Sequence, residues 1–543
     1  MSYSGNPGGY PPPGAPDPNY QPGFPQQPVS GYPDASQQPV SGYPTAPQDP
    51  QMMGAGTPMM PPPPPGDIHL GAMGPGGAPK KRRSPLVLSI IGLVAVLAIG
   101  GVAWAGVAYF NTEGTDTETS LPASTKAFIS FNLDVSKDEQ LKLADVAEKF
   151  PELTKENDPQ KMVEDELKKL EDTDSDLKGN LSDWVGLSGS TAIWSDSKDN
   201  PYVLVSIDSR DDAKAKSGLK DLEKTGPGEG KMGYVVSDGH AMIAFGSSDS
   251  QNAAKAAAAE AKKSPLSDSD AYSEAADWLG DDQVVTAWAD MKPAWAAAKK
   301  MMGDSNSPLG SDGTMTSMLE SYDKQMQGKV AMGASATDYG LELKTRTFDG
   351  KDTPKGSPDL ANKFAALPKS DLAGAIAFPD DMTQGSLFSG MMAGGLGAST
   401  DPSGEMKTYL DALSGGTATL AMNGFASENP AGEGVIETTS ADKAQTLASL
   451  GEQSGGFLTA KADGNKVTMT SQGYTPGSGT MADEPNVKKA VEGAPKDLTY
   501  LVYADLSKMI PADEKDYAAM KGLSYVQGTD DNDTVGYVRL FVG

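Results

Sequence analysis

The chain has 543 residues, contains no cysteine and carries a formal net charge of −28 at pH 7. This length gives room for two or three domains, and the absence of thiols excludes disulfides, thiolate metal sites and cysteine nucleophiles. The acidic excess repels phosphate backbones, so it excludes nucleic acid as a partner.

Residues 1–85 form a tail rich in Pro, Gly, Gln and Tyr. The block QQPVSGYP occurs twice, at 26–33 and 37–44. Such a composition buries too little apolar surface to offset the entropy of ordering, so we expect a disordered tail. Two interpretations stay open: a simple spacer, or a docking tail for a cytoplasmic partner that recognises the Tyr-Pro repeats.

Residues 86–110 are an uncharged apolar run. A basic cluster lies just before it: Lys80, Lys81, Arg82 and Arg83. As a helix the run reaches about 37 Å, which predicts one transmembrane helix. The positive-inside rule then places the tail in the cytoplasm and the rest of the chain outside the cell membrane. A cleaved signal peptide, with a site after Ala105, is the competing interpretation, but the run is longer than a signal core.

A polar stalk, residues 111–120, leads into two halves, 121–348 and 367–543, joined by a linker, 349–366. Five sequence blocks of the first half return in the second in the same order. The paired blocks begin at Leu121 and Leu367, Leu187 and Leu413, Ser209 and Ser440, Asp238 and Asp463, and Ala287 and Val502. Five ordered matches indicate an internal duplication.

Alternating apolar and polar residues predict seven strands in each half. In the first half they are 127–133, 191–194, 202–207, 241–245, 284–289, 330–336 and 339–345. In the second half they are 373–378, 417–422, 434–439, 457–462, 466–471, 499–504 and 536–542. Asp238-Gly239 and Asp463-Gly464 predict two-residue hairpin loops. Helices beside hairpins predict an α+β fold with a mainly antiparallel sheet in each half.

A Pro-rich tail, a basic cluster and an apolar run precede the blocks LPASTKAFISFNLD, LSGSTA, DAKAKSGL and AWAD. This order resembles an actinobacterial family of single-pass membrane proteins, family 3352 of the domains of unknown function. The resemblance covers about residues 121–543. It implies an extracytoplasmic location in a high-GC Gram-positive bacterium, and it supplies no activity and no site residues.

The sequence offers no convincing catalytic set. His240 is the only histidine of the two halves, and a hairpin-edge role is favoured because no G-x-S-x-G elbow accompanies it. The Ser-x-x-Lys spacing occurs about as often as chance gives: Ser195/Lys198, Ser321/Lys324 and Ser440/Lys443. We therefore expect a protein that is not an enzyme and needs no cofactor.

Two acidic stretches are rich enough in Asp to be compared with calcium loops. Asp172, Asp174, Asp176 and Asp183 have EF-hand spacing, but Leu177 stands where that loop needs glycine. A solvated acidic turn is favoured there. The stretch 529–534 is interpreted as a hairpin tip.

The Gly-rich segment 386–399 is the candidate surface for an apolar ligand or a partner. Its candidate contact residues are Leu387, Phe388, Met391, Met392 and Leu396. Each would gain about 1.5–3 kcal/mol from full burial, whereas each neighbouring glycine disfavours a helix by up to about 1 kcal/mol. Packing onto the sheet as ordinary core is the default interpretation.

Two functional hypotheses follow. The first is a membrane-anchored, extracytoplasmic, non-catalytic protein that binds or scaffolds at the bacterial cell envelope, with an envelope protein or lipid as partner. The alternative is a carrier or sensor of a lipid or other apolar ligand, held in a cleft between the two halves.

Overall fold

The computed structural model divides the chain into two units, Met1–Ala78 and Pro79–Gly543. It describes residues 117–150, 161–171 in part, 180–225, 232–246, 249–303, 327–350, 355–380, 404–425, 430–452, 458–511 and 514–543. The predicted tail, basic cluster and apolar run lie outside these residues.

No helix within the described residues is long and apolar enough to cross a membrane. The longest of them have 14 residues, whereas a span needs about 20. The predicted fold class, which included a transmembrane helix, is therefore wrong for the described residues: they form a large antiparallel sheet, and none of their helices could span a membrane. The described helices all belong to the folded region, and the run 86–110 is not among the described residues.

Sixteen strands form one sheet, and every neighbouring pair is antiparallel. The first half contributes β1 (Ala127–Asn132), β2 (Val185–Ser195), β3 (Pro201–Ser209), β4 (Met232–Ser237), β5 (His240–Phe245), β6 (Val285–Asp290), β7 (Lys329–Thr337) and β8 (Gly340–Phe348). The second contributes β9 (Leu372–Ala377), β10 (Thr417–Asn423), β11 (Ala431–Glu437), β12 (Leu458–Asp463), β13 (Lys466–Ser471), β14 (Asp497–Ala504), β15 (Met520–Asp530) and β16 (Asp533–Val542).

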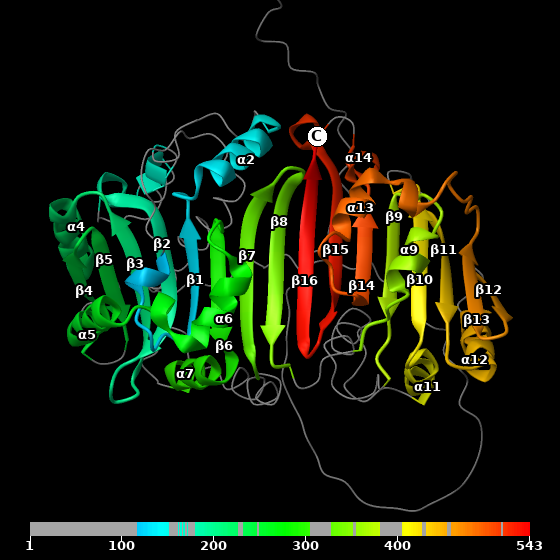
Figure 1. The fold of residues 1–543 in the computed structure, drawn as a ribbon, viewed down its shortest axis with the longest axis horizontal. Coiled ribbons are helices and arrows are strands. Elements are labelled where there is room, and N and C mark those ends of the chain that lie inside the picture. The colour runs from blue at the N-terminus through cyan, green and yellow to red at the C-terminus, as the bar shows by residue number, and fades with distance from the viewer. Residues whose placement is uncertain are drawn as a thin grey trace, which may run out of the picture. The chain divides into compact units, whose positions relative to one another are not determined.

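The strand order repeats between the halves (Figure 1). The first half runs β4-β5-β3-β2-β1-β6-β7-β8, and the second runs β12-β13-β11-β10-β9-β14-β15-β16. Adding eight to each label of the first order gives the second. This is the arrangement that an internal duplication predicts, and it pairs each strand with a defined counterpart.

The prediction of a separate sheet in each half is wrong, because β8 and β16 pair with each other. Each is the last strand of its half, and alone each would leave a row of unpaired backbone groups at a sheet edge. Joining the two edges satisfies both rows. Two further strands, β4 and β15, were not predicted individually.

Helices cover both faces of the sheet. One face, here called the α2 face, packs against α2 (Lys137–Glu148), α4 (Asp212–Thr225), α7 (Met291–Gly303), α11 (Gly404–Leu413) and α12 (Ala441–Glu452). The other, the α5 face, packs against α5 (Ser250–Lys263), α6 (Asp270–Leu279), α9 (Leu360–Ala365) and α13 (Pro485–Ala490). The remaining helices are short: α14 (Leu506–Met509), η2 (Thr117–Ser120), η3 (Leu181–Asp183), η4 (Leu266–Asp268), η5 (Met481–Asp483) and η6 (Lys515–Tyr517).

Strand β3 shows how one sheet is buried on both sides. Val203, Val205 and Ile207 belong to the core of the α2 face. Tyr202 and Leu204, which alternate with them, belong to the core of the α5 face. Because successive side chains point to opposite faces of a strand, this continuous apolar run fills two layers at once.

Two arginines hold the β8–β16 pairing together. Glu342 of β8 and Arg539 of β16 form an ion pair at 2.7 Å, with side chains 16% and 5% exposed. Arg346 of β8 pairs with Asp533 of β16 at 2.6 Å. Arg539 also donates to two backbone carbonyls at the end of α13, at 2.8 and 2.7 Å. Each ion pair therefore joins one half to the other.

Arg539→Met tests this clamp. The substitution leaves Glu342 without its partner in a largely buried position, so we expect the free energy of unfolding to fall by roughly 3 kcal/mol. The surface pair Lys262–Asp238, whose side chains are 78% and 71% exposed, supplies the control Lys262→Met, expected to cost less than about 1 kcal/mol. Thermal and denaturant midpoints measure both. Equal, small shifts would contradict the assignment.

Helix α2 is anchored to β7 through a buried acid. The Glu139 side chain is 2% exposed, and its carboxylate accepts a hydrogen bond from the backbone N–H of Ala336. Burial raises the pKa of Glu139 to about 7, and the carboxylates of Asp282 and Asp138 add to this rise. The Ala336 N–H and Lys142 act in the opposite direction.

This raised pKa predicts a pH dependence of stability. Between pH 4.5 and 7 the folded state holds a proton that the unfolded state has released, so stability falls as the pH rises through this window. Glu139→Gln removes the ionisation and keeps an acceptor for Ala336. We expect it to flatten this slope and to be more stable than the wild type at pH 8 by on the order of 2 kcal/mol. Melting curves at pH 5 and pH 8 check this, and an unchanged slope would refute it.

Candidate functional site

The site residues predicted from the sequence lie outside the described part of the chain. These are Leu387, Phe388, Met391, Met392 and Leu396, together with Lys80, Lys81, Arg82 and Arg83. Their roles therefore stay predictions. The other candidates can be followed in the structure.

His240 has a structural position. It opens β5, directly after the loop Asp238-Gly239, and faces Asp208 of β3. Burial raises the pKa of the Asp208 carboxyl, and His240 opposes that rise. The counterpart of this pair is Glu437 and Lys466, an ion pair at 2.7 Å. An acid and a base thus recur at equivalent positions, which favours the predicted hairpin-edge role.

The second hairpin differs by one residue from its prediction. Its closing pair is Asp463↔Lys466, so its loop is Gly464-Asn465 and not Asp463-Gly464. Gly464 has φ +57°, a left-handed conformation that glycine adopts without steric cost. His240 therefore corresponds to Lys466 and not to Asn465.

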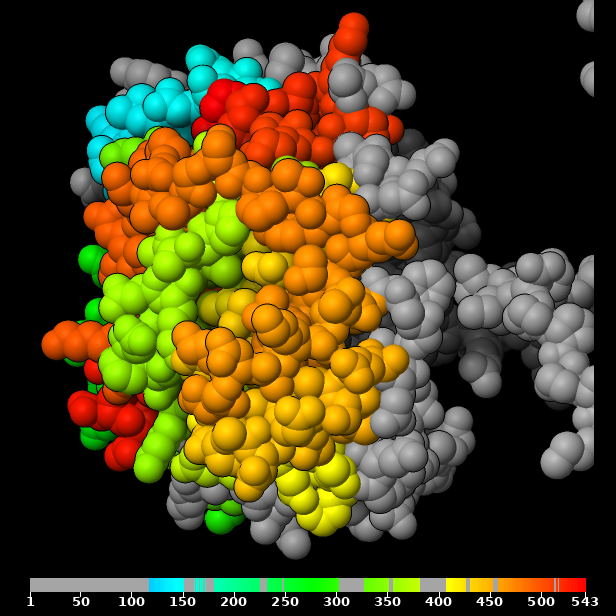
Figure 2. All heavy atoms as spheres, turned by 90° about the vertical axis from the view of Figure 1, so that its right-hand side faces the viewer, coloured from blue at the N-terminus to red at the C-terminus, as the bar shows by residue number. Residues whose placement is uncertain are grey.

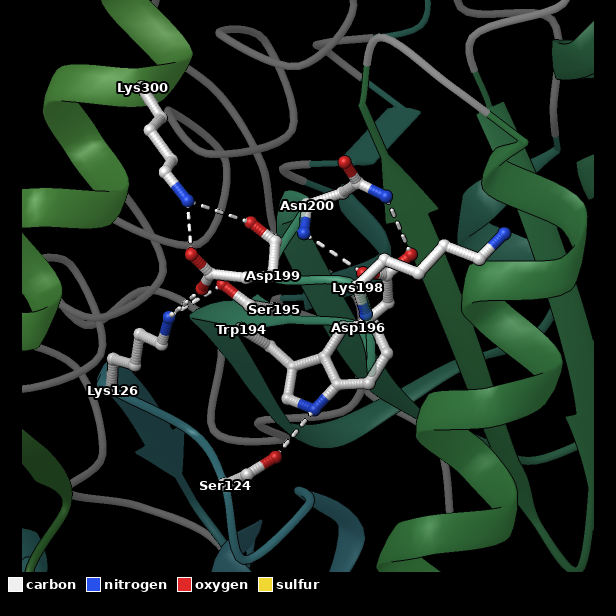
Figure 3. A network of polar contacts seen from close by, with 9 residues as sticks. All are labelled: Ser124, Lys126, Trp194, Ser195, Asp196, Lys198, Asp199, Asn200 and Lys300. Atoms are coloured by element: carbon white, nitrogen blue, oxygen red, sulfur yellow. Dashed lines mark hydrogen bonds and ion pairs between the residues drawn. The ribbon is translucent and has the colours of Figure 1, made fainter.

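Ser195 lies in a polar network around the β2–β3 hairpin (Figure 3). Its Oγ is 2.6 Å from Nζ of Lys126, and Lys126 also pairs with Asp199 at 3.5 Å. Asp199 pairs in turn with Lys300 of α7. The side chain of Lys198 points away from Ser195. The network ties β1, the hairpin and α7 together, and an ammonium held by a carboxylate is not a general base.

The other Ser-x-x-Lys pair that the structure describes also has a structural role. Oγ of Ser440 accepts a hydrogen bond from the backbone N–H of Lys443 at the start of α12, as a helix-capping serine does. The sequence also contains Lys-Thr-Gly at 224–226. There Lys224 pairs with Asp221 at 3.3 Å within α4. No nucleophile and base come together at these positions.

The acidic stretches form no metal site among the described residues, where no cluster of three candidate ligands occurs. Most of 172–183 lies outside those residues. The stretch 529–534 is a hairpin tip, as predicted, because Asp530 and Asp533 close the β15–β16 turn. Asp533 is also committed to the ion pair with Arg346.

The most unusual surface is on the α2 face of the second half. We call it the open face, and its residues are Leu372, Gly374, Leu420, Met422, Gly434, Val502, Leu523, Tyr525 and Val538. Strand pairing places most of them in one row: Gly434↔Leu420↔Gly374↔Val502↔Tyr525↔Val538. Leu420 and Leu523 are each 39% exposed, and Tyr525 is 38% exposed. Large apolar side chains gathered on one face mark interaction sites more often than scattered ones do.

Two glycines in this row have room for a side chain. Among the described residues, a Cβ on Gly374 would meet nothing nearer than Cγ2 of Val502 at 3.8 Å, and one on Gly434 nothing nearer than a backbone oxygen at 3.6 Å. Gly189, on the same face of the first half, is different, because a Cβ there would lie 2.9 Å from the Phe131 ring. Glycine inside a strand weakens it and often marks a close approach by a ligand or another backbone.

The open face exists because the halves differ in one helix. In the first half, α7 has 13 residues and packs against β2, β3 and β6. Its counterpart α14, which follows β14, has 4 residues and packs against β15. The counterparts of β2 and β3 are β10 and β11, which carry Leu420 and Gly434. Among the described residues, the strand surface that corresponds to the one under α7 has a single helical turn beside it.

Two tyrosines lie close together on the α2 face of the second half. The rings of Tyr500 and Tyr525 lie 6.4 Å apart, and burial raises the pKa of both hydroxyls. The range 367–543 holds 23 acidic against 12 basic residues. Figure 2 looks onto the β12 side of the sheet, where residues of about 430–490 form most of the coloured surface. The open face thus offers an apolar surface in a half of the chain that carries net negative charge.

Comparison with known proteins found no match: no family model, no curated protein and no solved structure resembles this chain significantly. The resemblance to family 3352 therefore stays a prediction. The open face must be judged on its own geometry.

Sequence reasoning missed the open face, although two signals were present. Gly374 lies in the middle of a predicted strand, and the residues after the VYAD block lack the long Ala-rich run that follows AWAD. Neither signal shows which face a residue occupies, because this depends on the register of strands distant in sequence.

The glycines supply a test of this geometry. Gly374→Ala and Gly434→Ala should each leave stability unchanged or raise it by up to about 1 kcal/mol, since alanine costs less backbone entropy. Gly189→Ala should lower it by about 1–3 kcal/mol through the contact with Phe131. Thermal midpoints of the three variants measure the difference. If Gly374→Ala were as destabilising as Gly189→Ala, something would already fill the space above it.

Proposed function

We propose that this protein is a non-catalytic binding protein that contacts its target through the open face. The observation behind the proposal is that Leu420, Leu523 and Tyr525 are exposed on one sheet surface, beside the open glycines Gly374 and Gly434. Burying such side chains in an interface would gain roughly 25 cal/mol per Å² of apolar area. Large aromatic residues are also frequent anchors of protein interfaces.

The candidate catalytic residues support a binding role. Ser195 is engaged by Lys126, and Ser440 lies at the start of α12. His240 matches an ion-paired lysine in the other half. Ser195 and Ser440 thus have structural roles, whereas no described helix packs over Leu420, Gly374 and Gly434. The predicted place at the bacterial cell envelope stays a prediction.

The alternative is a carrier of a lipid or other apolar ligand. It was predicted to use a cleft between the halves, but β8 and β16 are hydrogen-bonded neighbours there. Among the described residues, the open face is the apolar surface that could take a lipid instead. The two functions then differ in the chemical class of the occupant, which can be measured.

Photo-crosslinking separates these functions. A benzophenone amino acid at Tyr525, in the full chain and in the cells that naturally produce it, should give a discrete protein adduct. The matched control is position 141, because Leu141 is 66% exposed on α2, a helix that packs over β7 and β8 of the first half. Mass spectrometry identifies the adduct. Lipid adducts alone would favour the carrier, and equal labelling at both positions would refute the proposal.

A further inference from the structure

The open face lies on the counterparts of strands that carry helix α7 in the first half, and this leads to one inference that rests on the proposed function. We infer that the open face receives an amphipathic helix of a partner protein, with small and apolar residues on its buried side and lysines along its exposed side. The argument uses the first half of the same chain as the template for the second.

Helix α7 shows what the equivalent strand surface accepts. Ala294 and Ala297 are buried, at 8% and 2% exposure, and Met301 packs against the core of the α2 face. Small side chains let the helix backbone come close to the strands. In the second half, the described counterpart of α7 is the four-residue helix α14, which packs against β15 and not against β10 or β11.

The open glycines match this mode of contact. Gly374 and Gly434 flank Leu420 within the row, so they leave bare backbone on either side of one apolar side chain. A helix with alanines at its contact positions can bring its backbone close to such a surface, because neither partner has a large side chain at the contact. Nothing else among the described neighbours requires glycine at these two positions.

Charge favours a basic helix. Sequence 291–303 carries Lys292, Lys299 and Lys300 and no acidic residue. In the first half, Lys300 is held by Asp199. The second half has nearly twice as many acidic as basic residues, so it attracts a basic helix and repels an acidic one or an anionic membrane surface.

The test uses α7 itself as the probe. A fluorescent peptide of residues 291–303, with blocked ends, is titrated into the full-length protein and followed by anisotropy. We expect saturable binding that Leu420→Glu weakens at least tenfold. Gly374→Ala and Gly434→Ala should also weaken it, without lowering the melting temperature. Leu141→Glu, on α2, is the matched control and should leave binding unchanged.

The same assay tests the role of the peptide's positive charge and the identity of the molecule that binds the open face. A peptide with its three lysines changed to glutamate should bind at least tenfold more weakly at low salt. Absence of binding, or binding indifferent to Leu420→Glu and Gly374→Ala, would overturn the inference. So would a change of oligomeric state by Leu420→Glu, since a second copy would then be the occupant. If Tyr525 still crosslinks to a protein when the peptide does not bind, the helix inference fails while the binding function stands.

Discussion

The pairing of β8 with β16 is the constraint on which the rest of this structure depends. Two halves with the same strand order each end in a strand that would otherwise be a sheet edge. An antiparallel pair of equivalent strands satisfies both edges at once and places the halves about a local twofold relation. The ion pairs Glu342–Arg539 and Arg346–Asp533 then fix the register of the two strands, and each pair joins one half of the chain to the other. This explains why two of the three arginines after residue 120 lie on these two strands.

Duplication makes the differences between the halves informative. Equivalent strands occupy equivalent places, so any surface covered in one half and exposed in the other needs a local reason. The length of the helix after β6 and β14 is such a reason. In the first half this helix, α7, has 13 residues and covers neighbouring strands. In the second half its counterpart, α14, has 4 residues. The open face is the result of this difference, and the glycines beneath it show that the strands are not built to be covered by large side chains of their own.

The polar side chains that the sequence suggested as candidates have structural roles in the described fold. Ser195 and Ser440 each have a hydrogen-bonded partner that orients a hairpin or a helix, and His240 lies opposite Asp208 in the β3–β5 pair. Glu139 holds α2 against β7 at the expense of a raised pKa. Buried polar groups with partners make a fold specific, whereas exposed apolar groups without partners invite binding.

The sequence by itself determined the strands and the duplication. Alternation with a period of two residues is a local signal, so β1, β3, β5 and their counterparts could be recognised from it. Five ordered blocks predicted the repeated strand order. The predicted sheet in each half was wrong because the pairing of two edge strands depends on groups nearly 200 residues apart, which no local pattern encodes. The open face was missed for the same reason: the register across β10, β9, β14 and β15 decides which side chains share a surface, and only the tertiary structure sets that register.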